Sequence, residues 1–179
     1  AWELNQAFLS LWDNTVTKYS WVLPDNFHAG FKVMKECKER VMFLNRPYNV
    51  KYYKNAPVDD GRALSANQIH SVDGLTVREV TTRAAYSQKE TFMNLFLWFK
   101  ENKNQGKDAL KDSHLRSVLQ HYHDSGFLSA RVLDLIDQTN AGILNQEEQE
   151  AVLHLCKTLP NKSFQVISIH DKYLCLPNY

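Results

Sequence analysis

Two short apolar runs near the end of the chain constrain the fold more than any other feature. Residues 163–169 (SFQVISI) and 173–176 (YLCL) are rich in large apolar side chains, and only residues 170–172 (HDK) separate them. Runs of this length and composition are typical of buried strands, and so short a connection joins antiparallel neighbours. The sequence therefore predicts an antiparallel hairpin with a polar turn at residues 170–172.

Most of the remaining chain has a helical pattern. Apolar residues recur at the spacing of one helix face. Ser129 and Asn145 are suited to cap two helix starts, and Glu148 follows Asn145 at capping-box spacing. We expect helices over residues 3–19, 76–86, 91–101, 113–123, 130–138 and 145–159. Together with the hairpin, these helices predict the α+β fold class.

A segment of β character and positive charge lies between the first two predicted helices. Residues 41–44 (VMFL) and 50–53 (VKYY) flank the polar run 45–48 (NRPY), which predicts a hairpin or an extended loop. Residues 31–54 hold seven Lys or Arg against two Glu, a local excess of five in a chain of net charge +1. Such an excess forms either a solvated amphipathic face or a surface for an anionic partner. Residues 57–67 are polar and predict an exposed loop.

Composition excludes membrane proteins and disulfide-rich secreted proteins. The longest apolar stretch is far too short to span a bilayer, and the chain shows no signal peptide. The three cysteines are widely spaced and form no C-x-x-C pair, which fits reduced thiols rather than a disulfide framework or a zinc site. We therefore expect a cytoplasmic protein. Because the chain starts at Ala1 without Met and stops just after the second strand, we also expect it to be part of something longer.

Three other features predict structure rather than a site. His114 and His121 share a helix face but lack a third ligand, which favours a solvated helix with scattered histidines. The aromatic block at residues 92–99 predicts core packing rather than a base-stacking platform. Cys37 has no basic partner in the sequence, which argues against a catalytic thiol.

Asp171 is the best candidate for chemistry because it lies at the predicted hairpin turn. A carboxylate held at the end of a small sheet suits a hard divalent cation, which prefers oxygen ligands and often a substrate phosphate. Nucleotidyl transfer uses two such ions, one at the attacking hydroxyl and one at the leaving group. The alternative is an ordinary polar turn, in which Asp is common for its local hydrogen bonds.

Two further segments give this turn a context. Residues 69–74 (IHSVDG) precede the predicted helix 76–86, and residues 21–27 (WVLPDNF) contain turn-forming residues. With residues 169–173 (IHDKY), and in this order, these segments resemble motifs of the phage-type, or mitochondrial-type, single-subunit RNA polymerases. Residues 21–27 resemble the turn that opens the family's specificity hairpin, and the stretch that follows is similar to that hairpin.

The resemblance implies a role for each matching residue. Asp171 would be the second metal-binding aspartate of the polymerase palm, and His170 would shape the turn. His70 would lie near the minor groove of the newly formed base pair. Asp73 and Gly74 would cap and orient the helix that follows.

The resemblance also implies partners. Arg40, with Arg46 and Lys51, would lie on a hairpin that reads promoter DNA or grips the template, since phosphate contacts depend on Lys and Arg. The enzyme would bind template DNA, nascent RNA and nucleoside triphosphates. It would use two Mg²⁺ ions, for which this chain supplies the single ligand Asp171.

In fold, the resemblance implies a palm-and-fingers fragment with an inserted helical block. Residues 1–86 would form the fingers and specificity-hairpin region with a palm-proximal helix. Residues 87–161 would be a helical insertion of unknown role, because the family usually has a single helix there. Residues 162–179 would form the palm hairpin with the catalytic aspartate.

The chain departs from the family in several places. Lys172 stands where the family has a small residue. The segment of the first metal-binding aspartate, the Arg-x-x-x-Lys helix that binds the incoming nucleotide and the C-terminal tail have no match. One aspartate cannot hold two metal ions, so we expect the chain to be inactive alone and to be completed by a second polymerase polypeptide or by missing segments.

Two alternatives stay open. A fragment of the related DNA polymerase family is one, although that family prefers Glu after His-Asp, where this chain has Lys172. The other is a non-catalytic nucleic-acid-binding module, in which the basic segment carries the function and Asp171 is only a turn residue.

Overall fold

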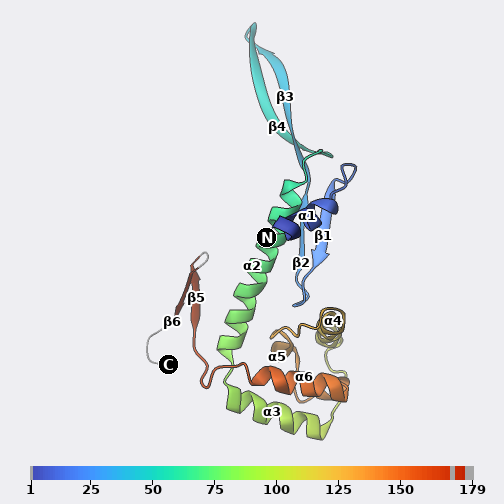
Figure 1. Cartoon of the computed structure of the whole chain (residues 1–179), viewed down its shortest axis with the longest axis vertical. Coiled ribbons are helices and arrows are strands. Elements are labelled where there is room, and N and C mark those ends of the chain that lie inside the picture. The colour runs from blue at the N-terminus through green and yellow to red at the C-terminus, as the bar shows by residue number, and fades with distance from the viewer. Residues whose placement is uncertain (1, 170–171, 176–179) are drawn as a thin grey trace. The chain divides into compact units, whose positions relative to one another are not determined.

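The computed structural model describes residues 2–169 and 172–175 (Figure 1). Within them, helices combine with small antiparallel hairpins, so the α+β class is confirmed. The elements are α1 (Trp2–Ser10), β1 (Lys18–Val22), β2 (His28–Lys32), β3 (Met34–Phe43), β4 (Arg46–Asn55), α2 (Arg62–Ala85), α3 (Gln88–Glu101), α4 (Ala109–Ser125), α5 (Val132–Leu135), the 3₁₀ helix η1 (Ala141–Ile143), α6 (Gln146–Cys156), β5 (Val166–Ile169) and β6 (Lys172–Cys175). In the described residues the strands pair only within the hairpins β1–β2, β3–β4 and β5–β6.

The chain divides into two compact units. Unit 1 comprises Ala1–Val22 and His28–Val72, and unit 2 comprises Leu23–Phe27 and Asp73–Tyr179. The long helix α2 therefore contributes residues to both units. The division into functional regions at residues 86 and 161, which the polymerase resemblance implies, stays a prediction.

Unit 1 begins with α1, which ends at Ser10, so the helix expected over residues 3–19 is wrong in its second half. Tyr19 instead lies in β1 and stacks on Trp12 and Phe31, with ring centroids 5.0 and 5.6 Å apart. An aromatic stack between a turn, a strand and its neighbour outweighs the helical spacing, because local propensity is a weak prior against tertiary packing.

Helix α2 begins at Arg62, so the loop expected over residues 57–67 is wrong from that position onward. Its first turns are held by tertiary contacts: Leu64 and Ser65 are buried, and Ser65 Oγ donates a hydrogen bond to Asn5 Oδ1 at 2.6 Å. The mostly polar sequence of α2 concealed this start. In the described part of the chain, no helix has both the length and the apolar character needed to cross a membrane.

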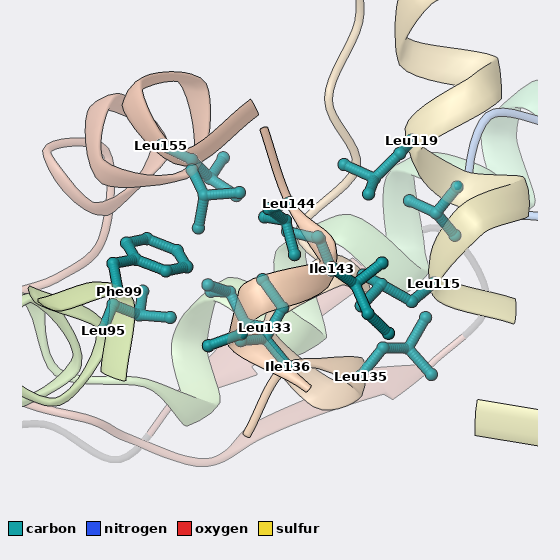
Figure 2. Packing of buried hydrophobic residues seen from close by; sticks show 14 of the residues in the cluster. Leu95, Phe99, Leu115, Leu119, Leu133, Leu135, Ile136, Ile143, Leu144 and Leu155 are labelled. Atoms are coloured by element: carbon teal, nitrogen blue, oxygen red, sulfur yellow. The ribbon is translucent and has the colours of Figure 1, made fainter. Parts of the chain in front are cut away.

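The core of unit 2 is built from α3, α4, α5, η1 and α6 (Figure 2). On α4, Leu115, Val118 and Leu119 recur at the spacing of one helix face and are fully buried. The cluster consists of Leu95, Phe99, Leu115, Val118, Leu119, Val132, Leu133, Leu135, Ile136, Ala141, Ile143, Leu144, Val152, Leu155, Cys156 and Leu159. The expected helices at α3, α4 and α6 are confirmed.

The start of α6 follows the sequence prediction closely. Asn145 Oδ1 accepts from the backbone N–H of Glu148 at 2.9 Å, and Glu148 Oε2 accepts from the backbone N–H of Asn145 at 2.8 Å. The predicted capping box is therefore confirmed. The buried Glu148 also contacts His123, whose Nε2 lies 3.0 Å from Oε1.

The helix expected over residues 130–138 is shorter than predicted. Only Val132–Leu135 is helical, as α5, and Arg131 is its N-cap. Ser129 is not the N-cap: its Oγ donates to Glu79 of α2 and accepts from the backbone N–H of Arg131 at 3.2 Å. A contact with a residue distant in sequence has replaced the local cap.

Gly142 joins η1 to the end of α3. Its backbone N–H donates to the Lys103 carbonyl at 2.7 Å. A side chain at this position would place Cβ 2.7 Å from the Asn102 carbonyl oxygen, so only glycine fits without a backbone shift.

Candidate nucleic-acid interface

The β3–β4 hairpin is the most exposed element of unit 1 (Figure 1). Its ten residue pairs run from Met34↔Asn55 to Phe43↔Arg46, and Leu44 and Asn45 form the two-residue turn with φ of 49° and 59°. Positive φ at both central residues is the geometry of the tight hairpin turns that match strand twist. The expected hairpin is confirmed, although its strands are longer and its turn shorter than the sequence indicated.

Cross-strand pairing sorts the hairpin side chains onto two faces, because directly opposed residues point the same way. We call one the basic face: it carries Lys38 opposite Lys51, and Arg40 opposite Asn49. The other, mixed face carries the apolar or aromatic residues Cys37, Val41, Phe43, Tyr48, Val50 and Tyr52, together with Lys35 opposite Lys54, Glu39, and Arg46 at the tip. The structure therefore brings Arg40 and Lys51 together and places Arg46 on the opposite face, at the tip.

The charges of the basic face are only partly neutralised. Glu36 Oε1 lies 3.4 Å from Lys51 Nζ and 3.8 Å from Lys38 Nζ, so one carboxylate is shared by two ammonium groups. Arg40 forms no ion pair with any described residue. Directly opposed like charges are unfavourable in a hairpin, and a bound anion relieves that repulsion. This arrangement suits phosphate oxygens.

Neither face of the hairpin is covered in the described chain. Every residue of β4 is exposed, and in β3 only Cys37 is partly buried. Two-stranded hairpins without a covered face are marginally stable in water, so a partner surface would stabilise this one. Phe43 and Tyr48 stiffen its tip through an edge-to-face contact at 6.3 Å.

The motif residues of α2 are inside the helix and do not precede it. His70, Asp73 and Gly74 all lie within Arg62–Ala85, so the expectation that Asp73 and Gly74 cap a following helix is wrong. His70 and Asp73 are exposed and lie three residues apart, on one side of the helix. A Cβ on Gly74 would lie 3.3 Å from Arg78 Nη1, so this glycine leaves room for that side chain.

The segment over residues 21–27 is held against α2 at both of its ends. In unit 1, Trp21 Nε1 donates to Ser71 Oγ at 2.9 Å. In unit 2, Arg78 Nε donates to Asp25 Oδ2 at 2.5 Å. Two of the three segments that carry the polymerase resemblance are therefore in direct contact through their side chains.

Asp25 is the most deeply buried carboxylate of this arrangement. Its side chain is 2% exposed, and Oδ1 accepts from the Phe27 backbone N–H at 3.3 Å. The Arg78 guanidinium lies 4.1 Å from the centroid of the Phe27 ring, a cation–π contact. The sequence analysis did not select Arg78. Its place four residues after Gly74, a position where the helix has no side chain, could have indicated it.

Glu79, next to Arg78, was also missed. Its buried carboxylate accepts from Ser129 Oγ, and from the Ala130 backbone N–H at 3.0 Å, and Arg83 Nε lies 3.2 Å away. These bonds tie α2 to the segment that precedes α5 within unit 2. No local pattern in the sequence indicates this pairing, because its partners are about 50 residues apart.

His170 and Asp171 lie outside the described residues, so their predicted roles stay predictions. The predicted C-terminal hairpin is confirmed up to them, because β5 and β6 are antiparallel and Ile169 pairs with Lys172. Among the described residues, no three His, Cys, Asp or Glu side chains converge on a point that could hold a metal ion.

Comparison with known families and with curated proteins finds no match to this sequence.

Proposed function

We propose that the chain is a C-terminal part or subunit of a DNA-dependent RNA polymerase of the single-subunit type, with a palm-and-fingers architecture. The observation that carries the proposal is the contact of the segment over residues 21–27 with α2, through Trp21–Ser71 and Asp25–Arg78. Motifs that match a family only by chance have no reason to be neighbours in the fold. In this chain Trp21 and Ser71, one from each of two matching segments, share a hydrogen bond, and Asp25 of the first segment pairs with Arg78, just beyond the second.

The hairpin residues have a specific task in this proposal. Arg40 and Lys51 on the basic face contact the phosphates of promoter or template DNA, and Lys38 beside them adds a third cation. Arg46 at the tip reaches DNA from the other face. Exposed cations on a projecting hairpin supply affinity and orientation and do not by themselves read sequence.

The catalytic part of the proposal concerns Asp171. Its carboxylate supplies one ligand for the two Mg²⁺ ions that assist nucleotidyl transfer in polymerases. His170 orients the turn, and His70, exposed on α2, lies toward the base pair formed by the incoming nucleoside triphosphate. The remaining ligands and the nucleotide-binding helix come from a second polypeptide or from segments outside these 179 residues.

A non-catalytic nucleic-acid-binding module is the second candidate function. One observation favours it: Lys38, Arg40 and Lys51 lie together on an uncovered face of β3–β4, so phosphate contacts there do not require Asp171. The two candidates agree on DNA binding and differ on RNA synthesis. A fragment of the related DNA polymerase family is distinguished by its use of deoxynucleotides.

The catalytic proposal is tested on the enzyme purified through a tag on this chain. Asp171→Ala should abolish RNA synthesis from ribonucleotides and leave DNA binding unchanged, because the carboxylate serves the metal ions and not the duplex. Asp59→Ala, at an exposed carboxylate, is the matched control and should leave both unchanged. Synthesis that survives Asp171→Ala contradicts the assignment. A purified assembly that binds DNA but never makes RNA supports the binding module instead.

The hairpin is tested on the full chain with a fluorescent DNA duplex at several salt concentrations. Replacing Lys38, Arg40 and Lys51 with Ala removes three phosphate contacts and should reduce the slope of log K against log salt by about 3. The control replaces the exposed cations Lys107 and Arg116, and should leave the slope unchanged. Equal slopes for the hairpin variant and the wild type would exclude the basic face as the DNA surface.

A further inference from the structure

Helix α3 exposes a large apolar surface, contrary to the expectation that the block at residues 92–99 is core. Leu95 and Phe99 do face the core (Figure 2), but four neighbours do not. The exposed fractions are 37% for Phe92, 50% for Met93, 50% for Phe96 and 51% for Leu97. We call these four residues the α3 patch. It belongs to the predicted helical insertion, and neither DNA binding nor catalysis uses it.

The α3 patch forms two parallel ridges, because residues four apart stack along a helix. Phe92 and Phe96 form one ridge, with nearly parallel rings 6.3 Å apart. Met93 and Leu97 form the other. The groove between two such ridges is the feature into which a ridge of a second helix packs. The geometry therefore favours a helical occupant.

Each ridge ends in a lysine. Lys100 continues the first ridge one turn beyond Phe96, and Lys89 precedes Met93 by one turn on the second. Neither forms an ion pair with any described residue. The nearby Glu101, by contrast, is engaged by Lys103 Nζ at 2.9 Å. The exposed Glu90, next to Lys89, accepts a hydrogen bond from Ser87 Oγ at 3.2 Å. The patch is therefore apolar in the middle, with a lysine that has no ion pair at each end.

Two hollows extend the patch toward the end of α6. The first, of about 270 Å³, is lined by Lys89, Phe92, Met93 and Lys157, among others. The second, of about 670 Å³, also includes Lys89, Glu90 and Met93 and has Lys162 on its wall. The concave surface beside the ridges thus carries further positive charge.

We propose that the α3 patch is a docking site for an amphipathic helix of a protein partner, with an apolar middle and carboxylates at both ends. The two lysines are 11 positions apart, so the acidic side chains of the occupant must be about 16 Å apart along its axis. Charge complementarity and the ridge geometry together specify this occupant.

A second copy of the chain fits less well. Antiparallel pairing of two α3 helices about their middle places Lys89 of one copy opposite Lys100 of the other, so like charges meet at both ends. A membrane surface also fits less well, because ridges with a groove and adjoining hollows are suited to interlocking side chains. Both occupants are outcomes of the following test.

The experiment selects displayed 18-residue helices against the full chain. The library varies Leu, Phe and Ala on one face, and varies Glu, Gln and Lys at the flanking positions three turns apart. Recovered helices should carry Glu at both ends. In fluorescence anisotropy, a recovered peptide should bind a Phe96→Ser, Leu97→Ser variant about tenfold more weakly, because exposed apolar anchors dominate such contacts.

Charge reversal provides the sharper test. Lys89→Glu with Lys100→Glu should weaken the Glu-ended peptide about tenfold and make the Lys-ended peptide the better ligand. The matched control, Lys107→Glu with Leu110→Ser at exposed positions of and beside α4, should bind as the wild type does. Circular dichroism checks that every variant is folded.

Several outcomes overturn the proposal. They are recovery of no helix, recovery of helices without acidic ends, and binding that is insensitive to both α3 variants. Self-association in sedimentation that the Phe96→Ser, Leu97→Ser variant abolishes assigns the patch to a second copy. Binding to phosphatidylserine vesicles without peptide binding assigns it to a membrane.

Discussion

The ion pair between Asp25 and Arg78 offers a quantitative test of the contact that carries the proposed function. The perturbation is Arg78→Met, which keeps most of the side-chain length and removes the charge. Asp25 is 2% exposed, so the change leaves a carboxylate without its cation in a site that water barely reaches. It also removes the cation–π contact with Phe27.

The expected cost follows from the burial of the two partners. Breaking a buried pair by removing one partner costs about 3–5 kcal/mol, because the other charge stays buried and unpaired. The Arg78 side chain is 31% exposed, which places the cost near the lower end, at about 3 kcal/mol. For a chain of this size, 1 kcal/mol lowers the melting temperature by about 2–4 °C, so we expect a decrease of about 6–12 °C.

The assay is thermal unfolding followed by circular dichroism, with Arg62→Met as the matched control. Arg62 also pairs with an aspartate, Asp60, but both side chains are mostly exposed and the melting temperature should not change. The double variant Asp25→Asn, Arg78→Met should regain part of the lost stability, since it no longer buries a charge. A melting temperature for Arg78→Met equal to that of the control would refute the reasoning.

Two further predictions concern titrating groups of the chain. Burial raises the pKa of the Cys156 thiol to about 11. In a Cys175→Ser chain at pH 8, a thiol reagent should therefore label Cys37 in the folded state and Cys156 only on unfolding. Equal labelling rates for the two thiols would contradict the burial of Cys156. Burial acts to raise the pKa of Asp137, but hydrogen bonds, above all from Lys111, outweigh it and lower the pKa from 3.8 to about 2. The stabilising effect of the ionised carboxylate is present above pH 4 and is lost as the pH falls toward 2. The difference in urea midpoint between wild type and Asp137→Asn should therefore shrink over that pH range. A constant difference would disprove the lowered pKa of Asp137.

Elements with strong local rules could be predicted from the sequence. The capping box of Asn145 and Glu148 is a local motif, and it forms as expected. The β3–β4 and β5–β6 hairpins follow from short apolar runs around short polar connections. In each case the residues that determine the structure are near neighbours in the chain.

Features set by distant partners could not be predicted in this way. The early start of α2 depends on burial of Leu64 and Ser65, and the replacement of the Ser129 cap depends on Glu79. The block at residues 92–99 is predicted as core because of its spacing on a helix, but apolar residues lie on more than one face of α3, and spacing does not reveal which face has a neighbour. Only the fold shows that Phe96 is half exposed.

The geometry around the predicted site residues could not be derived from the sequence. Placing His70, Asp73 and Gly74 before a helix was wrong, and their position inside α2 changes what they can do. Arg40 and Lys51 could be selected from charge alone, but their common face and the opposite placement of Arg46 depend on strand register. A shift of one residue in register would exchange the faces.

The segment over residues 69–74 separates into two kinds of position once the fold is known. Ser71 accepts the hydrogen bond from Trp21, and Gly74 leaves space for Arg78, so these two positions serve the packing of α2. His70 directly precedes Ser71 and Asp73 directly precedes Gly74, and both His70 and Asp73 are exposed. Each of the two exposed residues is therefore followed by one that serves the packing of α2, and the histidine and the aspartate stay accessible on the helix surface. That division supports the polymerase proposal over the binding module, because a module that acts through β3–β4 alone gives His70 no task.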